Sequence, residues 1–234
     1  MKTSNLSLRA FAGHVIIGLS NLVFGQSQPA YSAVANYLAP DAIDAANLLA
    51  PYPEANGTAA EIQHNLSLQA SRTAADCARA NSEVSISLDH FFGPANGPLT
   101  AAEVTAWKPL MDRVYADANY FVGLAKDKWK RPRPFQTDPS IQPCIPFANY
   151  HDDSYPSGHT TYARLYADIL GQIDPTRRRE FAVRSEQIGE DRVIGGVHQE
   201  SDVQAGQVLA DQIFLALLKS PQFINEVKQL QPAH

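Results

Sequence analysis

The chain has 234 residues, of which 44% are hydrophobic and 18% charged, with a formal net charge of -5 and two cysteines. This composition excludes a disordered polyelectrolyte, a collagen-like repeat and a disulfide-dense miniprotein, each of which needs a strong compositional bias. The acidic balance argues against a nucleic-acid polymer as partner, because such binders carry a basic patch. A chain of this length buries about 70% of its unfolded surface, so one domain folds without a metal or disulfide.

Residues 1–25 predict a signal peptide. Two basic residues precede a short apolar run, and small residues suited to cleavage follow, with Gly25 favoured over Ala35 as the cleavage site. The alternative is a frayed or buried amphipathic N-terminal helix. No stretch approaches the roughly 20 apolar residues that a membrane span requires, so we expect no integral membrane association. We therefore expect a periplasmic or secreted protein whose mature domain, residues 26–234, carries 17 basic and 24 acidic residues, or -7.

The two cysteines, Cys77 and Cys144, are 67 positions apart. This separation suits neither a redox pair nor a zinc site. An oxidising compartment would permit them to form a disulfide, and two buried free thiols are the alternative. The sequence leaves both open.

The remaining chain predicts an all-α protein with a single compact helical domain, since no convincing run of alternating strand residues occurs. Residues 93–98 and 138–155 have the composition of loops. The helix expected to begin at Thr100 contains Pro109, which should either kink it or start a second helix. Helices are expected over residues 41–49, over residues 58–80, from a capping box at Thr100 and Glu103 through residue 124, and after Asp174-Pro175 and Ser220-Pro221.

Three short stretches carry candidate chemistry: residues 126–134, 156–159 and 192–202. Taken alone, each has an ordinary explanation. The first can be a solvated basic face, the second a turn, and the third a pair of side chains one turn apart on a surface helix. Together they resemble the three-part signature of the type 2 phosphatidic acid phosphatase (PAP2) superfamily, a lysine with Arg-Pro, then Pro-Ser-Gly-His, then an arginine, histidine and aspartate. Ten residues match in order, which has a chance probability of about 10⁻¹³ at 1 in 20 per position.

Within that superfamily the chain most resembles the class A bacterial non-specific acid phosphatases. The likeness lies in residues 48–53, 155–160 and 201–205, and it implies an all-helical fold. One position departs from the pattern, because Asp191 stands where the family usually has serine before the arginine of the third motif. A carboxylate beside a phosphate site would repel a dianion unless a neighbouring cation neutralises it.

Phosphoryl transfer needs fixed donors around the negatively charged oxygens. Lys126, Arg133 and Arg192 would supply three positive charges, and a guanidinium can bind two phosphate oxygens at once. Ser157 and Gly158 precede an expected helix near residue 159, whose first N–H groups favour an anion. These five residues are the predicted phosphate-binding set.

Two histidines are predicted to divide the catalysis. If residues 198–202 are helical, Asp202 lies one turn beyond His198, accepts a hydrogen bond from one ring nitrogen and leaves the other free to attack phosphorus. His198 is thus the expected nucleophile, forming a phosphohistidine. His159 has no obvious partner and would protonate the leaving group, then activate water. Since this acid would start protonated near the ordinary pKa of histidine, we expect an acid-to-neutral pH optimum. The resemblance implies the same roles.

This scheme needs no metal and no cofactor, and vanadate is expected to act as an inhibitor that mimics phosphate. Three further histidines, His64, His90 and His151, are expected to have structural or surface roles. Three residues of the basic run fall outside the matching positions and are expected to be exposed, namely Lys128, Lys130 and Arg131.

The predicted protein is a metal-independent acid phosphatase that hydrolyses small phosphomonoesters. One alternative is a vanadate-dependent haloperoxidase using the same oxyanion site, and another is a helical protein that binds phosphate without turnover. A lipid phosphate substrate is disfavoured, because lipid phosphatases of this superfamily usually carry several membrane spans. The sequence leaves open the natural substrate, transfer to an alcohol acceptor and assembly into a homo-oligomer.

Overall fold

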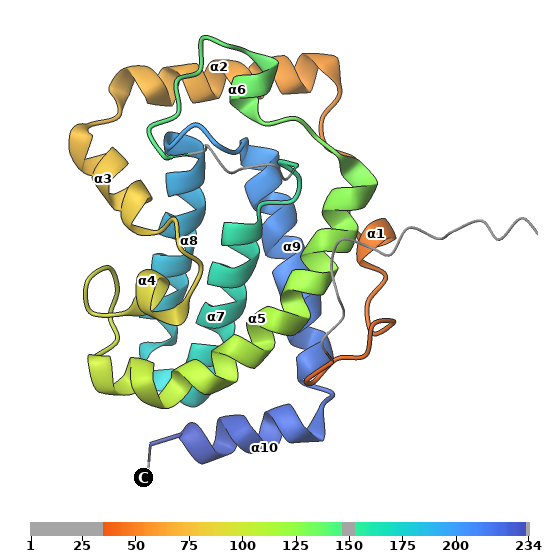
Figure 1. Cartoon of the computed structure of the whole chain (residues 1–234), viewed down its shortest axis with the longest axis vertical. Helices are drawn as coiled ribbons and strands as arrows, with labels where there is room; N and C mark the ends of the chain where they lie inside the picture. Colours follow the sequence, from red (N-terminus) through yellow and green to blue (C-terminus); the bar gives the residue numbers. More distant parts are fainter. Residues whose placement is uncertain (1–34, 147–152, 233–234) are drawn as a thin grey trace, which may run out of the picture.

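Helix α7 (Gly158–Ile173) lies at the centre of the fold, and α5 (Ala101–Trp129), α8 (Arg178–Ile194) and α9 (Glu200–Leu217) pack against it (Figure 1). The computed structural model describes residues 35–146 and 153–232, in which every regular element is a helix. The predicted signal peptide lies outside the described residues. The expectation of a single all-α domain is confirmed. The elements are α1 (Ala45–Leu48), α2 (Ala55–Ser71), α3 (Ala74–Ser82), α4 (Leu88–Phe92), α5 (Ala101–Trp129), α6 (Pro134–Thr137), α7, η1 (Pro175–Arg177), α8 (Arg178–Ile194), α9 (Glu200–Leu217) and α10 (Pro221–Leu230).

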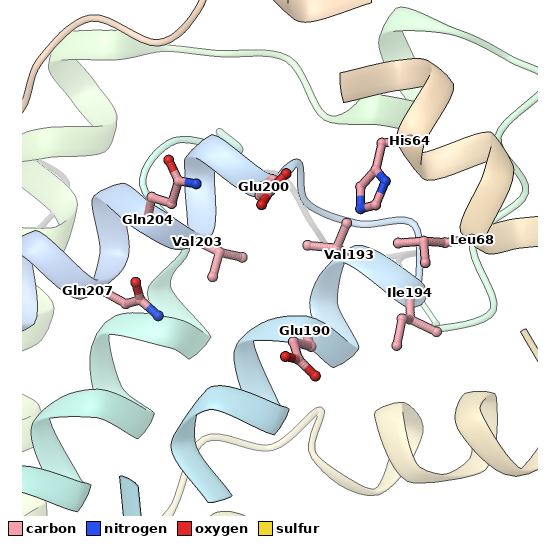
Figure 2. A pocket seen from close by; sticks show the side chains of 9 residues that line it. All are labelled: His64, Leu68, Glu190, Val193, Ile194, Glu200, Val203, Gln204 and Gln207. Atoms are coloured by element: carbon pink, nitrogen blue, oxygen red, sulfur yellow. The ribbon is translucent and has the colours of Figure 1, made fainter. Parts of the chain in front are cut away.

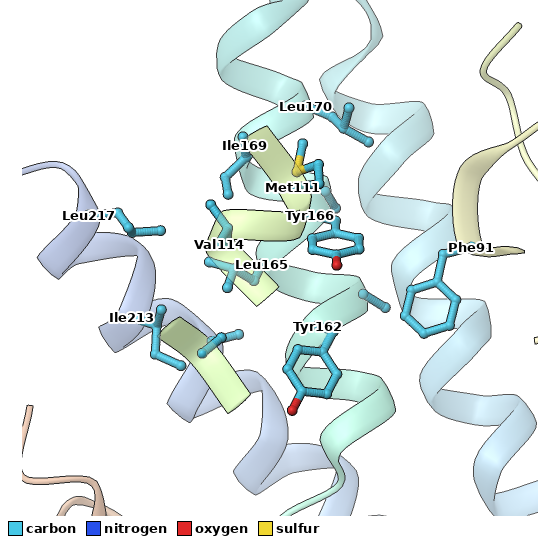
Figure 3. Close-up of a cluster of buried hydrophobic side chains, with 14 of the residues drawn as sticks. Phe91, Met111, Val114, Tyr162, Leu165, Tyr166, Ile169, Leu170, Ile213 and Leu217 are labelled. Atoms are coloured by element: carbon cyan, nitrogen blue, oxygen red, sulfur yellow. The ribbon is translucent and has the colours of Figure 1, made fainter. Parts of the chain in front are cut away.

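The core forms where α7 packs on α8, α9 and α5. Almost every residue of α7 is buried, as expected of a helix that is apolar around most of its circumference. Each large apolar side chain removed from water contributes about 1.5–3 kcal/mol, so this cluster is a main source of stability. Figure 3 shows part of this cluster and labels Phe91, Met111, Val114, Tyr162, Leu165, Tyr166, Ile169, Leu170, Ile213 and Leu217.

Helix α5 crosses the bundle, and its last turn contains Lys126 of the predicted site. It begins with the expected capping box, in which the Glu103 N–H donates to Thr100 Oγ1 at 3.2 Å and the Thr100 N–H donates to Glu103 Oε2 at 2.8 Å. The helix continues through Pro109, so the start of a second helix there is wrong. Pro109 and Thr105 are both exposed, and water can therefore bind the Thr105 carbonyl that proline leaves without its helical donor.

The single helix expected over residues 58–80 is also wrong, because α2 ends at Ser71 and α3 begins at Ala74. Thr73 starts the second helix with a capping box of its own, accepting from the Asp76 N–H at 3.2 Å. Arg72 leaves the helix in an extended conformation, and its guanidinium donates to the Ile194 carbonyl at 3.0 Å. Local capping and this long-range contact together outweigh the helix propensity of the sequence.

Cys77 and Cys144 form a disulfide with a Cα–Cα distance of 5.7 Å. Of the two alternatives that the sequence left open, the disulfide is therefore the one observed. It links α3 to the segment that follows α6.

Both Pro-initiated starts are confirmed. Asp174 accepts from the Thr176 N–H at 3.1 Å and opens η1, which leads into α8, and Ser220 accepts from the Phe223 N–H at 3.4 Å and opens α10. The helix expected over residues 41–49 is present but shorter, as α1. Residues 93–98 form turns, and the described part of the 138–155 segment contains no helix. Among the helices of the described residues, none is both long and apolar enough to cross a bilayer.

Candidate active site

The three sequence motifs meet at one end of the bundle. Lys126 lies in the last turn of α5, the Pro-Ser-Gly-His stretch begins α7, and the third motif runs from the end of α8 into α9. The Arg133 Nη1 group lies 2.9 Å from His198 Nε2, and the Ser157 N–H donates to the Asp202 carbonyl at 2.9 Å. The structure therefore brings together the predicted residues, all of which are buried: Lys126, Arg133, Ser157, Gly158, His159, Arg192, His198 and Asp202.

The hydrogen-bond partners of His198 determine its tautomer. Its Nδ1 lies 3.3 Å from Asp202 Oδ2, and its Nε2 faces the Arg133 guanidinium. A carboxylate can only accept and a guanidinium can only donate. The proton of the neutral ring must therefore be on Nδ1, which leaves the Nε2 lone pair directed at the cationic side of the site. This is the state that a nucleophilic histidine needs.

The expected reason for this contact was partly wrong. Residues 198–202 do not form one continuous helix, because α9 begins at Glu200 and Gln199 is its N-cap. The Gln199 N–H donates to Asp202 Oδ2 at 2.9 Å, and the His198 N–H donates to the Arg192 carbonyl at 3.2 Å. His198 is thus fixed by the turn that precedes the helix, and the capping carboxylate is the one that orients its ring.

Burial sets the protonation of this pair. It lowers the pKa of His198 to about 3, assisted by the positive charge of Arg133 and opposed by Asp202. Burial also raises the pKa of Asp202, but His198, Arg131 and the Gln199 N–H outweigh it and hold that pKa below its usual range. Neutral His198 beside an ionised Asp202 is therefore the state expected throughout the acid-to-neutral range.

Each predicted cation is held in place by polar groups of the fold. Lys126 Nζ donates to the Asp153 carbonyl, and Arg133 Nη1 donates to the Val197 carbonyl at 2.8 Å. Arg192 Nη2 donates to the Ala80 carbonyl and to Glu83 Oε2, both at 2.7 Å. Donors fixed in this way need little reorganisation when a charged ligand arrives.

The N-terminus of α7 forms as the sequence predicts. Ser157 is its N-cap and accepts from the Thr160 N–H at 3.3 Å, and Gly158 is the first helical residue. A Cβ added at Gly158 would make only ordinary contact, 3.4 Å from Tyr162 Cε2, so protein packing does not require glycine there. Gly206 of α9 is different, because a Cβ would lie 2.6 Å from the Ser157 carbonyl oxygen. This glycine lets α9 approach the start of α7, and the sequence analysis did not identify it.

His159 has a partner that the sequence did not show. Its Nε2 lies 3.1 Å from the Val84 carbonyl, which can only accept, so Nε2 carries a proton. Burial lowers the pKa of His159 well below its ordinary value, and the charges of Arg192 and Arg133 lower it further, against the Val84 hydrogen bond. The expectation of an ordinary histidine pKa is therefore wrong, and His159 is neutral before substrate binds.

Arg131 was expected to be exposed, and this is wrong. It is 1% exposed, whereas its neighbours Lys128 and Lys130 are exposed as expected. Its Nη1 donates to Asp202 Oδ1 at 2.7 Å. The sequence gives a weak signal for this difference, since Arg131 lies between the lysine and the Arg-Pro of the first motif.

Asp191 is neutralised from outside the motifs. It is fully buried, and Arg79 of α3 donates to its two oxygens from Nε at 2.8 Å and from Nη2 at 2.7 Å. The predicted repulsion of a phosphate dianion is therefore countered by a cation 112 residues away in sequence. Glu83 similarly lies between Arg184 and Arg192, with an oxygen 2.7 Å from each guanidinium.

A separate pocket of about 450 Å³ lies between α2, α8 and α9 (Figure 2). None of the predicted site residues lines it. Glu190 and Glu200 are among its lining residues, and their carboxylates make it unsuited to a phosphate. His64 also lines it and is exposed, as is His90, while His151 lies outside the described residues. In the described ranges, no three acidic, histidine or cysteine side chains are grouped so that they could hold a metal ion.

Comparison with known proteins finds a family model and curated relatives similar to this chain. Residues 114–226 match the model of the PAP2 superfamily, and this range contains all eight predicted site residues. Through this region the chain is similar to the PAP2 superfamily.

Two curated relatives bear the name non-specific acid phosphatase. The one from Salmonella typhi is 34% identical over 53% of this chain and 51% of its own length, and the one from Salmonella typhimurium is 32% identical over 66% and 64%. The chain thus spans between half and two thirds of these relatives. A transmembrane PAP2-type phosphatidylglycerolphosphate phosphatase from Bacillus subtilis is 20% identical, with a TM-score of 0.39 over 69% of this chain and 94% of that one.

Proposed function

We propose that this protein hydrolyses phosphomonoesters through a phosphohistidine formed on His198. The observation that carries the proposal is the arrangement of that ring, with its Nδ1–H directed at Asp202 and its Nε2 lone pair facing the Arg133 guanidinium. A nucleophile aimed at a group of buried cations suits an electrophile that carries negative charge. The names of the curated relatives support the same activity.

In the first step His198 Nε2 attacks phosphorus, and the bond between phosphorus and the ester oxygen breaks. Lys126, Arg133 and Arg192 bind the phosphoryl oxygens, together with the N–H groups at the start of α7. The leaving alcohol oxygen takes a proton from His159. In the second step His159 accepts a proton from water, whose oxygen attacks the phosphohistidine and releases orthophosphate and neutral His198.

The source of the proton follows from the state of His159. Because His159 is neutral in the free protein, the proton that the leaving group needs must enter with the substrate monoanion or be taken up when the dianion binds. A bound dianion favours the protonated ring, since opposite charges at close range raise the pKa of a histidine. We therefore propose an acid optimum that reflects the ionisation of the substrate phosphate.

We further propose that the enzyme is metal-independent, and that it acts in the periplasm or outside the cell. Three fixed cations supply the charge that metal ions supply in other phosphatases. The disulfide between Cys77 and Cys144 supports an oxidising compartment, as does the leader predicted in residues 1–25.

The test is hydrolysis of p-nitrophenyl phosphate with EDTA present, by the wild type and by His198→Ala. We expect chelator-resistant turnover that His198→Ala abolishes, and an acid-labile phosphoenzyme in the wild type only. Undiminished turnover in His198→Ala would refute the assigned nucleophile. Peroxide-dependent bromination in the presence of vanadate that exceeds phosphatase turnover would instead favour a haloperoxidase.

A further inference from the structure

Arg131 lies behind the proposed nucleophile, on the side of Asp202 away from the imidazole. Its Nη1 donates to Asp202 Oδ1 and to Ser201 Oγ, both at 2.7 Å, and its Nη2 donates to Glu61 Oε2 at 2.7 Å. Its guanidinium carbon is 4.7 Å from the centre of the Tyr52 ring. A fully buried arginine held by two carboxylates and an aromatic ring has one orientation available.

The two oxygens of Asp202 have different neighbours. Oδ2 accepts from Ser154 Oγ at 2.5 Å and from the Gln199 N–H at 2.9 Å, and it faces His198 Nδ1 at 3.3 Å. Oδ1 accepts from Arg131. The contact with Arg131 fixes Oδ1, and together with the two donors to Oδ2 it sets the rotation of the carboxylate that directs Oδ2 at the histidine.

Glu61 completes the network from helix α2. Its Oε2 binds Arg131, and its Oε1 accepts from the Ser201 N–H at 2.7 Å, in the first turn of α9. The positive charge of Arg131 is thus shared between Glu61 and Asp202. A buried charge is stable only when it is paired. Glu61 therefore provides a second carboxylate, which binds the Nη2 group of Arg131 that Asp202 does not reach.

We propose that Arg131, itself held by Glu61, is a positioning residue that fixes Asp202 and through it the reactive tautomer of His198. The inference rests on the proposed function and extends it to Arg131, which lies between the matching residues of the first motif, and to Glu61, which lies outside the three motifs. Without Arg131 the carboxylate can rotate, and the Nδ1–H of His198 loses its fixed acceptor. The loss would appear in the attack step, while the groups that bind phosphate stay in place.

The charge of Arg131 also affects ionisation. It helps hold the pKa of Asp202 low, and as a cation it disfavours a second positive charge on the adjacent imidazole. Removing it leaves the negative charge of Asp202 less compensated, so protonation of His198 becomes more favourable. The low-pH limb of kcat should then move to higher pH, which a purely structural role would not produce.

The experiment compares Arg131→Met, Arg131→Lys and Glu61→Gln with the wild type on p-nitrophenyl phosphate. Lys128→Met is the matched control, since it removes a charge from the exposed part of the same basic run. We expect Arg131→Met to lower kcat about 10- to 100-fold, by analogy with the loss of carboxylate partners of metal-bound histidines, with Ki for inorganic phosphate within about threefold. Arg131→Lys should recover part of the rate, and Glu61→Gln should lose less than Arg131→Met.

Combination with Asp202→Asn separates positioning from independent effects. If Arg131 acts through Asp202, adding Arg131→Met to Asp202→Asn lowers kcat by no more than about twofold further. Losses that multiply in full, an unchanged kcat in Arg131→Met, or a loss confined to the Ki for phosphate would each overturn the inference.

If Arg131→Met does not fold, Arg131→Lys and Glu61→Gln decide by the same readouts. A wild type without turnover refutes the proposed function itself, whereas an active wild type with unaffected variants refutes the positioning role alone.

Discussion

Replacing Arg79 by methionine removes the partner of a fully buried carboxylate. Arg79 binds both oxygens of Asp191, at 2.7 and 2.8 Å, and the two side chains differ in exposure, 32% for Arg79 against 0% for Asp191. The two single changes should therefore have unequal effects. Arg79→Met leaves a buried charge without its ion pair, while Asp191→Ser leaves an arginine that water and Asp76 can still reach.

The magnitude follows from this asymmetry. Removing one member of a buried pair costs about 3–5 kcal/mol, and we take about 3 kcal/mol because water reaches part of Arg79. A change of 1 kcal/mol shifts the Tm of a protein this size by about 2–4 °C, so Arg79→Met should lower the Tm by about 6–12 °C. Asp191→Ser should cost no more than about 1 kcal/mol, within the range of partly exposed ion pairs.

The assay is thermal unfolding of the two single variants and the double variant. Adding Asp191→Ser to Arg79→Met should restore most of the lost Tm, because the buried charge is then gone. Phosphate inhibition is measured alongside, and Asp191→Ser should leave Ki for phosphate within about twofold, since Arg79 already neutralises that carboxylate. Equal destabilisation by the two single variants, or no rescue in the double variant, would refute the reasoning. Phosphate binding tightened tenfold by Asp191→Ser would show that the charge of Asp191 reaches the site.

Two further predictions concern proton supply and helix approach. Burial lowers the pKa of His198 to about 3 and the pKa of His159 well below its ordinary value, so both rings are neutral near neutral pH in the free enzyme. Above the second phosphate pKa, about 6, kcat/KM should therefore fall tenfold per pH unit as the substrate monoanion is lost. Substrates differing by one unit in that pKa should shift this limb by one unit, and a limb at the same pH for both would point to an enzyme group instead. Gly206→Ala would place a Cβ 2.6 Å from the Ser157 carbonyl oxygen. We therefore expect about 1–3 kcal/mol of destabilisation, measured by thermal unfolding, and a lower kcat. The control variant Gln207→Ala should show neither effect.

Features that depend on a few neighbouring residues were predictable from the sequence. The capping box at Thr100, the start of α7 at Ser157 and the proline-initiated helices after Asp174 and Ser220 each form through hydrogen bonds within three residues. The order of residue types in the three motifs also predicted which side chains would gather. Such features are local in sequence, so a pattern contains most of the information that determines them.

The sequence alone therefore determined the helical class, the helix starts and the set of side chains that form the site. The tertiary structure decided the surroundings that set their chemistry. Arg131 and Arg79 bind carboxylates 71 and 112 positions away, and the Val84 carbonyl that binds His159 is 75 positions away. A pKa, a tautomer or the charge balance of a buried ion pair depends on which groups pack together across the fold, and neither residue spacing nor hydrophobic periodicity specifies those partners.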